Sequence, residues 1–547
     1  MTEILDQLID EGRVAASDRA RLARFLADQA GAGVGDCLRW TAERYGVRYS
    51  DLRGEEPDSA LLARFPAAVL WREELLPLHQ TEVGIEVATA ALFRTEGLDA
   101  LRRLAGEELV PVVVPDAALR EALKTHLGIG ADTLDSLGDR GVFASAETDA
   151  GVDLEEAAHD ATIIRFVNQI FTDAIRQRAT DIHLEPFEDE FRVRYRIDGV
   201  LQDVPVPATM KRYQPAIVSR IKILANLDIA EKRLPQDGRV KLRLAGSQID
   251  VRVSVIPMVH GEAVVMRLLR QDGTVIGLDR LAMGERELRL FRETLGLSHG
   301  IVLVTGPTGS GKTTTLYAAL QEINDSERKI ITIEDPVEYQ VKGVNQIQVN
   351  EKTALTFARG LRSILRHDPD VVLVGEIRDA ETAAIAVQAS LTGHLVFSTL
   401  HTNDSPSALT RLVDMGVEPY LVASSVDAIL SQRLVRVLCP HCKEPDDSAE
   451  TRRVLKGMAG VYRAVGCEAC RQTGFSGRRG IFELLDMREE LRRLIMDGCS
   501  AGQLREAARG FGWRSLYEDG LRVIGEGDTT LAEVLRVSKA GLTGGEE

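Results

Sequence analysis

One segment of this 547-residue chain restricts both the ligand and the fold that must surround it. Residues 306–313 read Gly-Pro-Thr-Gly-Ser-Gly-Lys-Thr, a full match to the phosphate-binding loop pattern G-x-x-x-x-G-K-[ST]. A short apolar run, Ile301 to Thr305, precedes this loop, and Thr314 to Asn324 can continue as a helix. Because strand, glycine-rich loop and helix follow one another as the pattern requires, an incidental glycine-rich turn is the weaker interpretation.

The residues of the loop have separate expected roles toward a nucleoside triphosphate. Glycines let backbone N–H groups point at a phosphate, and the first turn of the helix adds a partial positive charge. Lys312 reaches the β- and γ-phosphates, while the hydroxyl of Thr313 holds Mg²⁺. We therefore predict ATP and Mg²⁺ as ligands. The predicted nucleotide-binding residues of the loop are Gly306, Pro307, Thr308, Gly309, Ser310, Gly311, Lys312, Thr313 and Thr314.

Two glutamates follow apolar runs downstream of the loop. Glu334 ends the run from Ile330, and ligands of open α/β sheets bind at the carboxyl ends of strands, so we interpret it as a catalytic contact to the Mg-nucleotide. A polar turn before Pro336 is the alternative. Glu376 follows the run Val371 to Val374, as in a Walker B element, and is the predicted residue that polarises the attacking water.

His394 and His401 flank a further apolar run, Leu395 to Leu400. A lone histidine is usually structural, but two at the ends of one strand in the same sheet favour a γ-phosphate sensor or a contact to a neighbouring subunit. We assign His401 to catalysis and His394 to nucleotide binding.

Four cysteines form two C-x-x-C pairs, Cys439 with Cys442 and Cys467 with Cys470. Four thiolates complete a tetrahedral Zn²⁺ shell and leave no open position, so the spacing predicts a structural zinc site. His441 lies between two of these ligands and is the competing donor. The remaining cysteines, Cys37 and Cys499, and the lone His79 are interpreted as bystanders.

The length and charge of the chain limit its organisation and partners. A chain of 547 residues exceeds one core and predicts three or four domains. Its 67 basic and 83 acidic residues give a net charge of −16, which argues against nucleic acid as a partner. No apolar run is long enough to span a bilayer, and the acidic start lacks the features of a secretory signal, so we expect a cytoplasmic protein.

Changes in pattern along the chain predict its domains. Residues 1–134 form a small α+β docking domain without a catalytic constellation, and 135–158 form an acidic linker. Residues 159–273 form a second α/β domain, and 274–547 form the nucleotide-binding domain with a zinc-binding insertion at 437–480. The arginines of the second domain are read from pattern alone as solvated strand faces.

Taken together, these motifs resemble one family. Over residues from about 160 to 540, the chain resembles the secretion ATPases of bacterial type II secretion and type IV pilus assembly. The segments that carry the resemblance are the phosphate-binding loop, residues 333–338, 368–379 and 392–403, and the cysteine pairs. Residues 355–362 and 388–393 look more like the type II branch, and retraction motors typically lack the four cysteines.

The resemblance implies an α/β fold with a RecA-like P-loop domain, preceded by a PAS-like domain and the small α+β domain. It also implies a cytoplasmic homo-hexamer that acts on platform and cytoplasmic-domain proteins of the inner membrane and associates with that membrane through them. By the same resemblance, four arginines face nucleotide phosphates: Arg252, Arg267, Arg362 and Arg366. We assign Arg252 and Arg267, together with Lys312, to catalysis, and Arg362 and Arg366 to nucleotide binding. Paired Arg-Leu-Gly motifs, which bind cyclic di-GMP in some branches, are not matched at residues 12–14 and 35–37, so that ligand is not predicted.

Three alternatives remain open at this stage. A type IV pilus extension ATPase does the same chemistry for another fibre. A DNA-transfer hexamer of the same superfamily needs a basic pore, which the acidic balance disfavours. A nucleotide-binding scaffold without turnover is distinguished only by assay, because the residues for hydrolysis are present.

Overall fold

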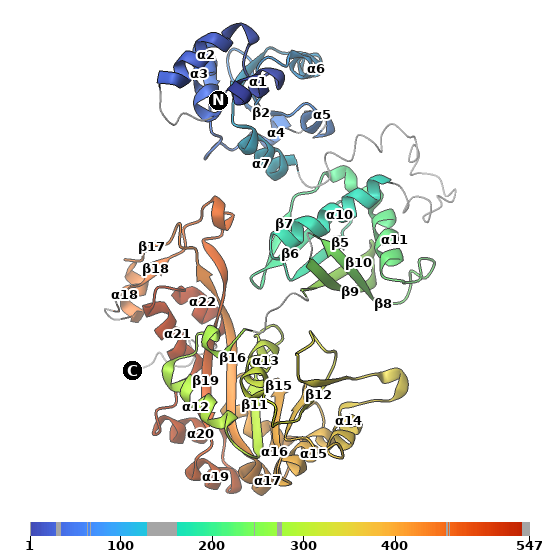
Figure 1. Cartoon of the computed structure of the whole chain (residues 1–547), viewed down its shortest axis with the longest axis vertical. Coiled ribbons are helices and arrows are strands. Elements are labelled where there is room, and N and C mark those ends of the chain that lie inside the picture. The colour runs from blue at the N-terminus through green and yellow to red at the C-terminus, as the bar shows by residue number, and fades with distance from the viewer. Residues whose placement is uncertain are drawn as a thin grey trace. The chain divides into compact units, whose positions relative to one another are not determined.

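The computed structural model describes residues 2–28, 34–62, 64–65, 67–127, 161–244, 247–270, 276–455, 458 and 460–538. The chain divides into two compact units, 1–270 and 271–547 (Figure 1). The predicted acidic linker at 135–158 and the predicted domain boundary at 273 lie outside the described residues. Among the described helices, none combines the length and apolar composition needed to cross a bilayer.

Residues 2–127 form a small α+β arrangement, as predicted, around a sheet of order β1-β4-β3-β2. β3 pairs in parallel with β4 and antiparallel with β2, so a crossover helix, α6, joins β3 to β4. Cys37 is buried in a separate small core with Leu8 and Leu22, which explains it as a packing residue. The strands are β1 (Arg48–Tyr49), β2 (Leu75–Gln80), β3 (Ile85–Thr89) and β4 (Leu109–Val113). The helices are α1 (Thr2–Asp10), α2 (Arg19–Asp28), α3 (Val34–Tyr45), α4 (Ser59–Leu62), α5 (Ala67–Arg72), α6 (Thr95–Ala105) and α7 (Asp116–Leu127).

Residues 161–270 form a sheet of order β7-β6-β5-β10-β9-β8, in which every pairing is antiparallel. Alternate residues such as Val251 and Val253 are buried against α10 and α11, so the intervening residues point to the other face of the sheet. The strands are β5 (Asp181–Pro186), β6 (Phe191–Ile197), β7 (Val200–Val204), β8 (Gln236–Leu244), β9 (Ser247–Met258) and β10 (Gly261–Arg270). The helices are α10 (Ala161–Arg176) and α11 (Gln214–Leu224).

The second unit is built on a sheet of order β13-β12-β14-β15-β11-β16-β19, parallel except for β19. Every residue of β11 and β15 is buried, as expected for parallel strands with helices on both faces. The strands are β11 (Gly300–Thr305), β12 (Ile330–Glu334), β13 (Asn345–Gln348), β14 (Val371–Val374), β15 (Leu395–Leu400), β16 (Val426–Leu438) and β19 (Phe475–Asp486).

Helices cover the two faces of this sheet in separate groups. One face packs against α12 (Glu285–Leu295) and α13 (Lys312–Ile323). The other face packs against α14 (Phe357–Ile364), α15 (Ala380–Leu391), α16 (Pro406–Asp414), α17 (Pro419–Ser425), α19 (Glu489–Met496) and α20 (Ala501–Arg509). The helix that follows the phosphate-binding loop therefore lies on the opposite face from α14 and α15.

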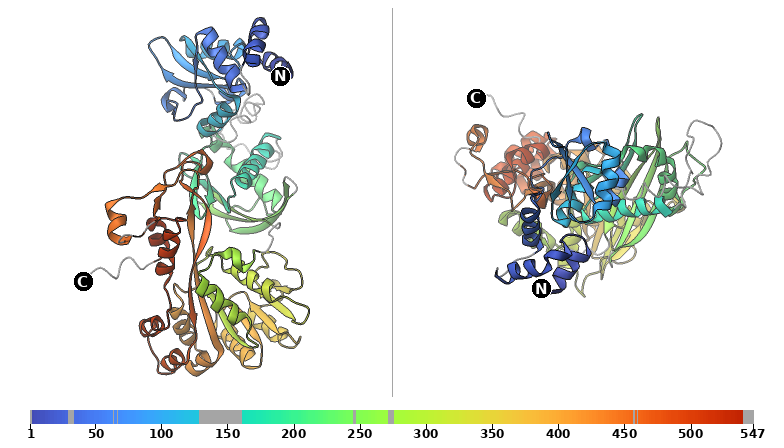
Figure 2. Two further views of the ribbon diagram at one scale, coloured as in Figure 1. Left: turned by 60° about the vertical axis from the view of Figure 1, so that its left-hand side comes forward. Right: turned by 90° about the horizontal axis from the view of Figure 1, so that it is seen from above.

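β16 and β19 are longer than their neighbours and extend past the sheet as an antiparallel ribbon (Figure 2). Beyond the sheet the ribbon packs against α21 (Leu516–Gly525) and α22 (Leu531–Val537). The segment between the two strands holds β17 (Glu444–Pro445), α18 (Ala449–Leu455) and β18 (Tyr462–Arg463), together with the four predicted zinc ligands.

Candidate functional site

The phosphate-binding loop connects β11 to α13. Gly306, Gly309 and Gly311 have φ angles of 147°, 78° and 91°, which strain any residue with a side chain. A Cβ atom on Gly306 would lie 2.6 Å from Ser310 Oγ and 2.6 Å from the carbonyl oxygen of Gln432. The loop is therefore packed against β16 too closely for any residue but glycine at 306.

Lys312 folds back over this loop. Its Nζ donates hydrogen bonds to the carbonyl oxygens of Gly306, at 2.8 Å, and Pro307, at 3.1 Å. Burial lowers the pKa of Lys312 to about 8; the charge of Glu376 opposes this shift and the charge of Arg433 adds to it. A half-buried ammonium group bonded to carbonyl oxygens is stabilised further by an anion, as a phosphate-binding role requires.

Glu376 and His401 follow the adjacent parallel strands β14 and β15. They lie at the edge where β11 ends, because Thr305 is opposite Leu400. Nε2 of His401 lies 3.4 Å from Oε2 of Glu376, and Arg378 pairs with the other carboxylate oxygen. The structure thus brings the loop, Glu376 and His401 to one edge of the sheet, where a carboxylate can orient water toward a bound phosphate.

Glu334 reaches the same edge but is enclosed. It is buried at the end of β12 and accepts hydrogen bonds from Thr332 Oγ1 at 2.6 Å, Gln346 Nε2 at 3.1 Å and the hydroxyl of Tyr317. Burial, together with the carboxylate of Glu334, raises the pKa of Tyr317 well above its usual range. Glu334 therefore fixes Tyr317 of α13 to β12, a contact that sequence reasoning did not anticipate.

His394 was expected beside the nucleotide, and the structure places it elsewhere. It precedes β15, and its carbonyl oxygen accepts from the N–H of Gly300 at the start of β11. A parallel strand brings only its carboxyl end to the phosphate-binding edge, so His394 lies at the opposite edge and does not join the loop of its own chain.

Arg362 and Arg366 also stand apart from the loop of their own chain. Both belong to the α14 segment, on the sheet face opposite α13. Arg362 pairs with Glu381 at 2.7 Å, and Arg366 donates to the carbonyl oxygen of Arg362 at 2.8 Å. Within one chain, the expectation that these arginines face the phosphates is not met.

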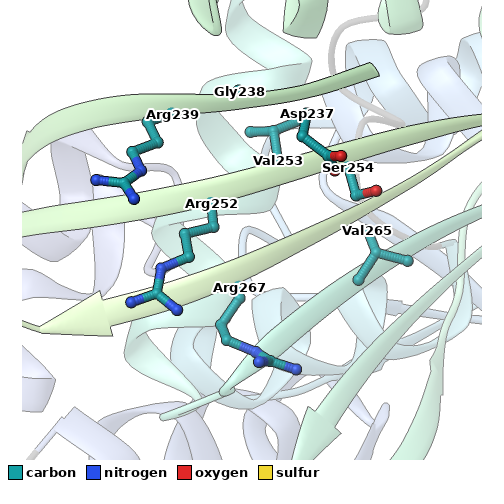
Figure 3. A pocket seen from close by; sticks show the side chains of 8 residues that line it. All are labelled: Asp237, Gly238, Arg239, Arg252, Val253, Ser254, Val265 and Arg267. Atoms are coloured by element: carbon teal, nitrogen blue, oxygen red, sulfur yellow. The ribbon is translucent and has the colours of Figure 1, made fainter. Parts of the chain in front are cut away.

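In the first unit, three arginines align across β8, β9 and β10. Arg252 is directly opposite Arg239 on one side and Arg267 on the other. They line one pocket, shown in Figure 3, which Asp237 and Ser254 also line. Arg239 was not predicted as a site residue, because the preceding Pro-Gln-Asp-Gly sequence is typical of a turn, whereas β8 begins at Gln236.

Arg267 in this row is oriented by an acid. Its Nε donates a 2.9 Å hydrogen bond to Oδ1 of Asp181, which is buried on β5. Arg196 lies 3.7 Å from the other carboxylate oxygen of Asp181. Because the row of Arg196, Arg267, Arg252 and Arg239 contains a single aspartate, the face suits an anion.

The four cysteines converge as predicted. Their Sγ atoms all lie within 4.8 Å of one another, and three of the separations are 3.7 to 3.9 Å. Zinc–thiolate bonds of about 2.3 Å in a tetrahedron place the sulfurs about 3.8 Å apart. Backbone N–H groups of Gly466, Cys467 and Gly474 also point at these sulfurs. The donor set therefore fits one structural Zn²⁺.

Two residues of β16, Gln432 and Arg433, contact the nucleotide-binding elements and were not among the predicted site residues. Gln432 Oε1 accepts a 2.7 Å hydrogen bond from Thr315 Oγ1 in the first turn of α13. Arg433 is buried below Gly306, with Nη1 3.0 Å from the position of a Cβ on that glycine. The sequence around Gln432 and Arg433 does not indicate these contacts, because they depend on the pairing of β11 with β16, two strands that are far apart in the sequence.

Two family descriptions match this chain. The family "Type II/IV secretion system protein" matches residues 156–536, which include the sheet of β5 to β10, the parallel sheet of the second unit and the cysteine cluster. The chain belongs to this family. A separate description, "MshEN domain", matches residues 45–132 in the first unit.

Relatives of the secretion family cover most of the chain. Type II secretion system protein HxcR of Pseudomonas aeruginosa is 56% identical over 387 residues, 71% of this chain and 80% of that protein. Type IV pilus assembly ATPase PilB of Myxococcus xanthus is 41% identical over 507 residues, 90% and 89% of the two chains. The solved structure of the ATPase DotB of Legionella pneumophila matches with a TM-score of 0.51 and 22% identity, over 68% of this chain and 95% of that one, which shows the shared fold.

These findings confirm several predictions. The chain is a secretion motor ATPase, its fold is the predicted α/β arrangement with an added N-terminal domain, and ATP hydrolysis is its activity.

Proposed function

We propose that this secretion ATPase powers protein export through a type II secretion system. The observation that carries the proposal is the meeting of Lys312, Glu376 and His401 at one edge of the parallel sheet, in a chain 56% identical to a type II secretion protein over 387 residues. The four clustered cysteines fit this branch and the pilus extension motors alike, because by the resemblance only retraction motors typically lack them.

At the site, the backbone N–H groups of the loop and Lys312 bind the phosphates of ATP, and Thr313 holds Mg²⁺. Bound Mg²⁺ neutralises charge that develops on the transferring phosphoryl group. Glu376 orients water for attack on the γ-phosphate, and His401 and Arg378 orient Glu376. Glu334 acts from a distance, by fixing the position of α13 through Tyr317.

The arginine row supplies further positive charge in this proposal. Arg252 and Arg267, with Arg239 beside them, contact phosphate and stabilise the charge of the transition state. Arg362, Arg366 and His394 lie away from the loop of their own chain, so in a homo-hexamer they serve a neighbouring subunit. Residues 1–134 dock the motor on inner-membrane proteins of the secretion apparatus, which gives a cytoplasmic protein a peripheral membrane location.

The cysteine cluster holds Zn²⁺ in a structural role. All four ligand positions are thiolates, so no position is left for catalysis. Zinc would stabilise the segment between β16 and β19, where secondary structure is sparse.

A type IV pilus extension ATPase is the second candidate, because PilB is 41% identical over 90% of this chain. Deletion of the gene in its own host separates the two. Loss of exported proteins with surface pili intact supports the type II assignment, whereas loss of pili with export intact assigns the chain to pilus assembly. Complementation with Lys312→Ala should restore neither function.

A further inference from the structure

Arg433 lies where the phosphate-binding loop meets the loop that follows His401. Its Nη1 donates to the carbonyl oxygen of Gln432 at 2.9 Å, below Gly306, and its Nη2 donates to the carbonyl oxygen of Asn403 at 2.8 Å. The side chain is 7% exposed, so these contacts are shielded from water. One guanidinium group therefore joins β16 to the segment that carries His401.

The far end of that segment is also fixed. Glu483 of β19 accepts hydrogen bonds from the backbone N–H of Ser405 at 2.7 Å and from its hydroxyl at 2.6 Å. Because Asn403 and Ser405 are both held by the β16/β19 ribbon, the position of His401 depends on these anchors.

The charge of Arg433 is poorly compensated by the protein. The structure gives its guanidinium two carbonyl partners and, among the described residues, no carboxylate within 4 Å. Asp404 and Glu483 act on it from further away, and burial lowers its pKa. Arg433 also disfavours the charged form of Lys312. Buried Arg433 and half-buried Lys312 place two cations beside one loop, and both are stabilised when a polyanion binds there.

We propose that Arg433 is a positioning residue of the ATPase site: it ties β16, the strand against which the phosphate-binding loop packs, to the segment carrying His401, and its charge strengthens binding of the polyphosphate. The inference rests on the proposed use of this loop for ATP. It gives Arg433 two separable tasks: the bridge needs both Nη atoms, whereas the attraction of phosphate needs only the positive charge.

Two substitutions separate these tasks in the full-length hexameric protein. Arg433→Lys keeps the charge but loses the two-pronged bridge, so ATP affinity should stay within about threefold while kcat falls at least tenfold. Arg433→Met removes both, so ATP affinity should also weaken at least tenfold. Arg436→Met is the matched control, because Arg436 lies on the same strand but pairs with Glu533 at 2.6 Å, outside the site.

The control should hold ATP affinity and kcat within about threefold of wild type. If Arg433→Lys has the kcat of the wild type, the proposed bridging role is wrong. If Arg433→Met binds ATP as tightly as the wild type, the proposed effect of the charge on ATP binding is wrong. Equal losses in Arg436→Met would reduce Arg433 to a packing residue. If Arg433→Met does not fold, the split between affinity and kcat in Arg433→Lys still decides the proposal. Absence of ATP binding and turnover in the wild type would instead contradict the proposed function.

Discussion

Nε2 of His401 lies 3.4 Å from Oε2 of Glu376, and this contact joins the ends of two neighbouring parallel strands. It places an imidazole against the carboxylate that we assign to the attacking water. The orientation of Glu376 is therefore set by β15 as well as by its own strand, and the predictions below begin with that carboxylate.

Glu376→Gln should retain ATP binding and lose most turnover, because the amide keeps the shape of the carboxylate but is a poor base. We expect kcat to fall by about 10² or more, the usual contribution of a positioned general base. Lys312→Ala should weaken ATP binding and turnover together. Nucleotide binding and single-turnover hydrolysis measure the two effects. The control is Glu489→Gln, whose side chain is 72% exposed on α19. Unchanged turnover in Glu376→Gln would remove it from the catalytic role.

The alkaline limb of kcat/KM should report Lys312. Its pKa is lowered to about 8, so the free enzyme loses this positive charge as the pH rises through that value. We expect kcat/KM for ATP to fall above about pH 8, whereas kcat at saturating ATP should persist to higher pH because bound phosphate stabilises the charged form. Lys312→Arg keeps its charge and should lack this limb. A wild-type profile that stays flat up to pH 10 would contradict the assignment.

Arg252→Ala and Arg267→Ala should each lower kcat at least tenfold, a loss of about 1.4 kcal/mol of transition-state stabilisation. Arg239→Ala should lower it in the same direction if the whole row binds phosphate. The measurement is steady-state ATPase activity of assembled hexamers with zinc content checked. Arg233→Ala is the control, since Arg233 pairs locally with Glu231 outside the row. Near wild-type activity in all three variants would leave the row as a solvated strand face.

Cys467→Ser should release zinc and loosen the segment between β16 and β19, because metal binding there is also folding energy. Elemental analysis measures the loss of zinc, and limited proteolysis measures the loosening of the segment. Basal ATPase activity should fall less than secretion does. Cys499 lies outside the cluster, so Cys499→Ser should keep its metal. Wild-type protein purified without chelator that holds less than about half an equivalent of zinc would count against the site.

Deletion of residues 1–134 should detach the motor from the membrane while basal ATPase activity survives, because this part of the chain contains none of the residues assigned to hydrolysis. Fractionation of cells that produce the shortened and the full-length chain compares their locations. Normal secretion and membrane association of the shortened protein would refute a docking role.

The parts of the site that could be predicted from the sequence are those encoded by short local motifs. The loop at Gly306–Thr313, Glu376 at the end of an apolar strand and the two cysteine pairs each occupy one short stretch whose spacing determines its chemistry. An apolar run does not reveal which of its ends meets the ligand, so the sequence did not separate His401, at the phosphate-binding edge, from His394, at the opposite edge. The surroundings of Arg433 and Arg239 depend on strand pairing, and a single sequence does not specify the register of distant strands, so neither arginine was predicted as a site residue.

β16 passes the phosphate-binding loop at Gln432 and ends one residue before the first cysteine of the cluster. Leu438 lies six positions after Gln432 along the strand, a distance of about 20 Å. Pairing with β19 along this stretch stiffens it. A tilt of about 10° at the loop would move the far end by about 3.5 Å, given that length. The ribbon therefore connects the phosphate-binding loop mechanically to the cysteine cluster, and a small displacement at the loop would reach the cluster enlarged.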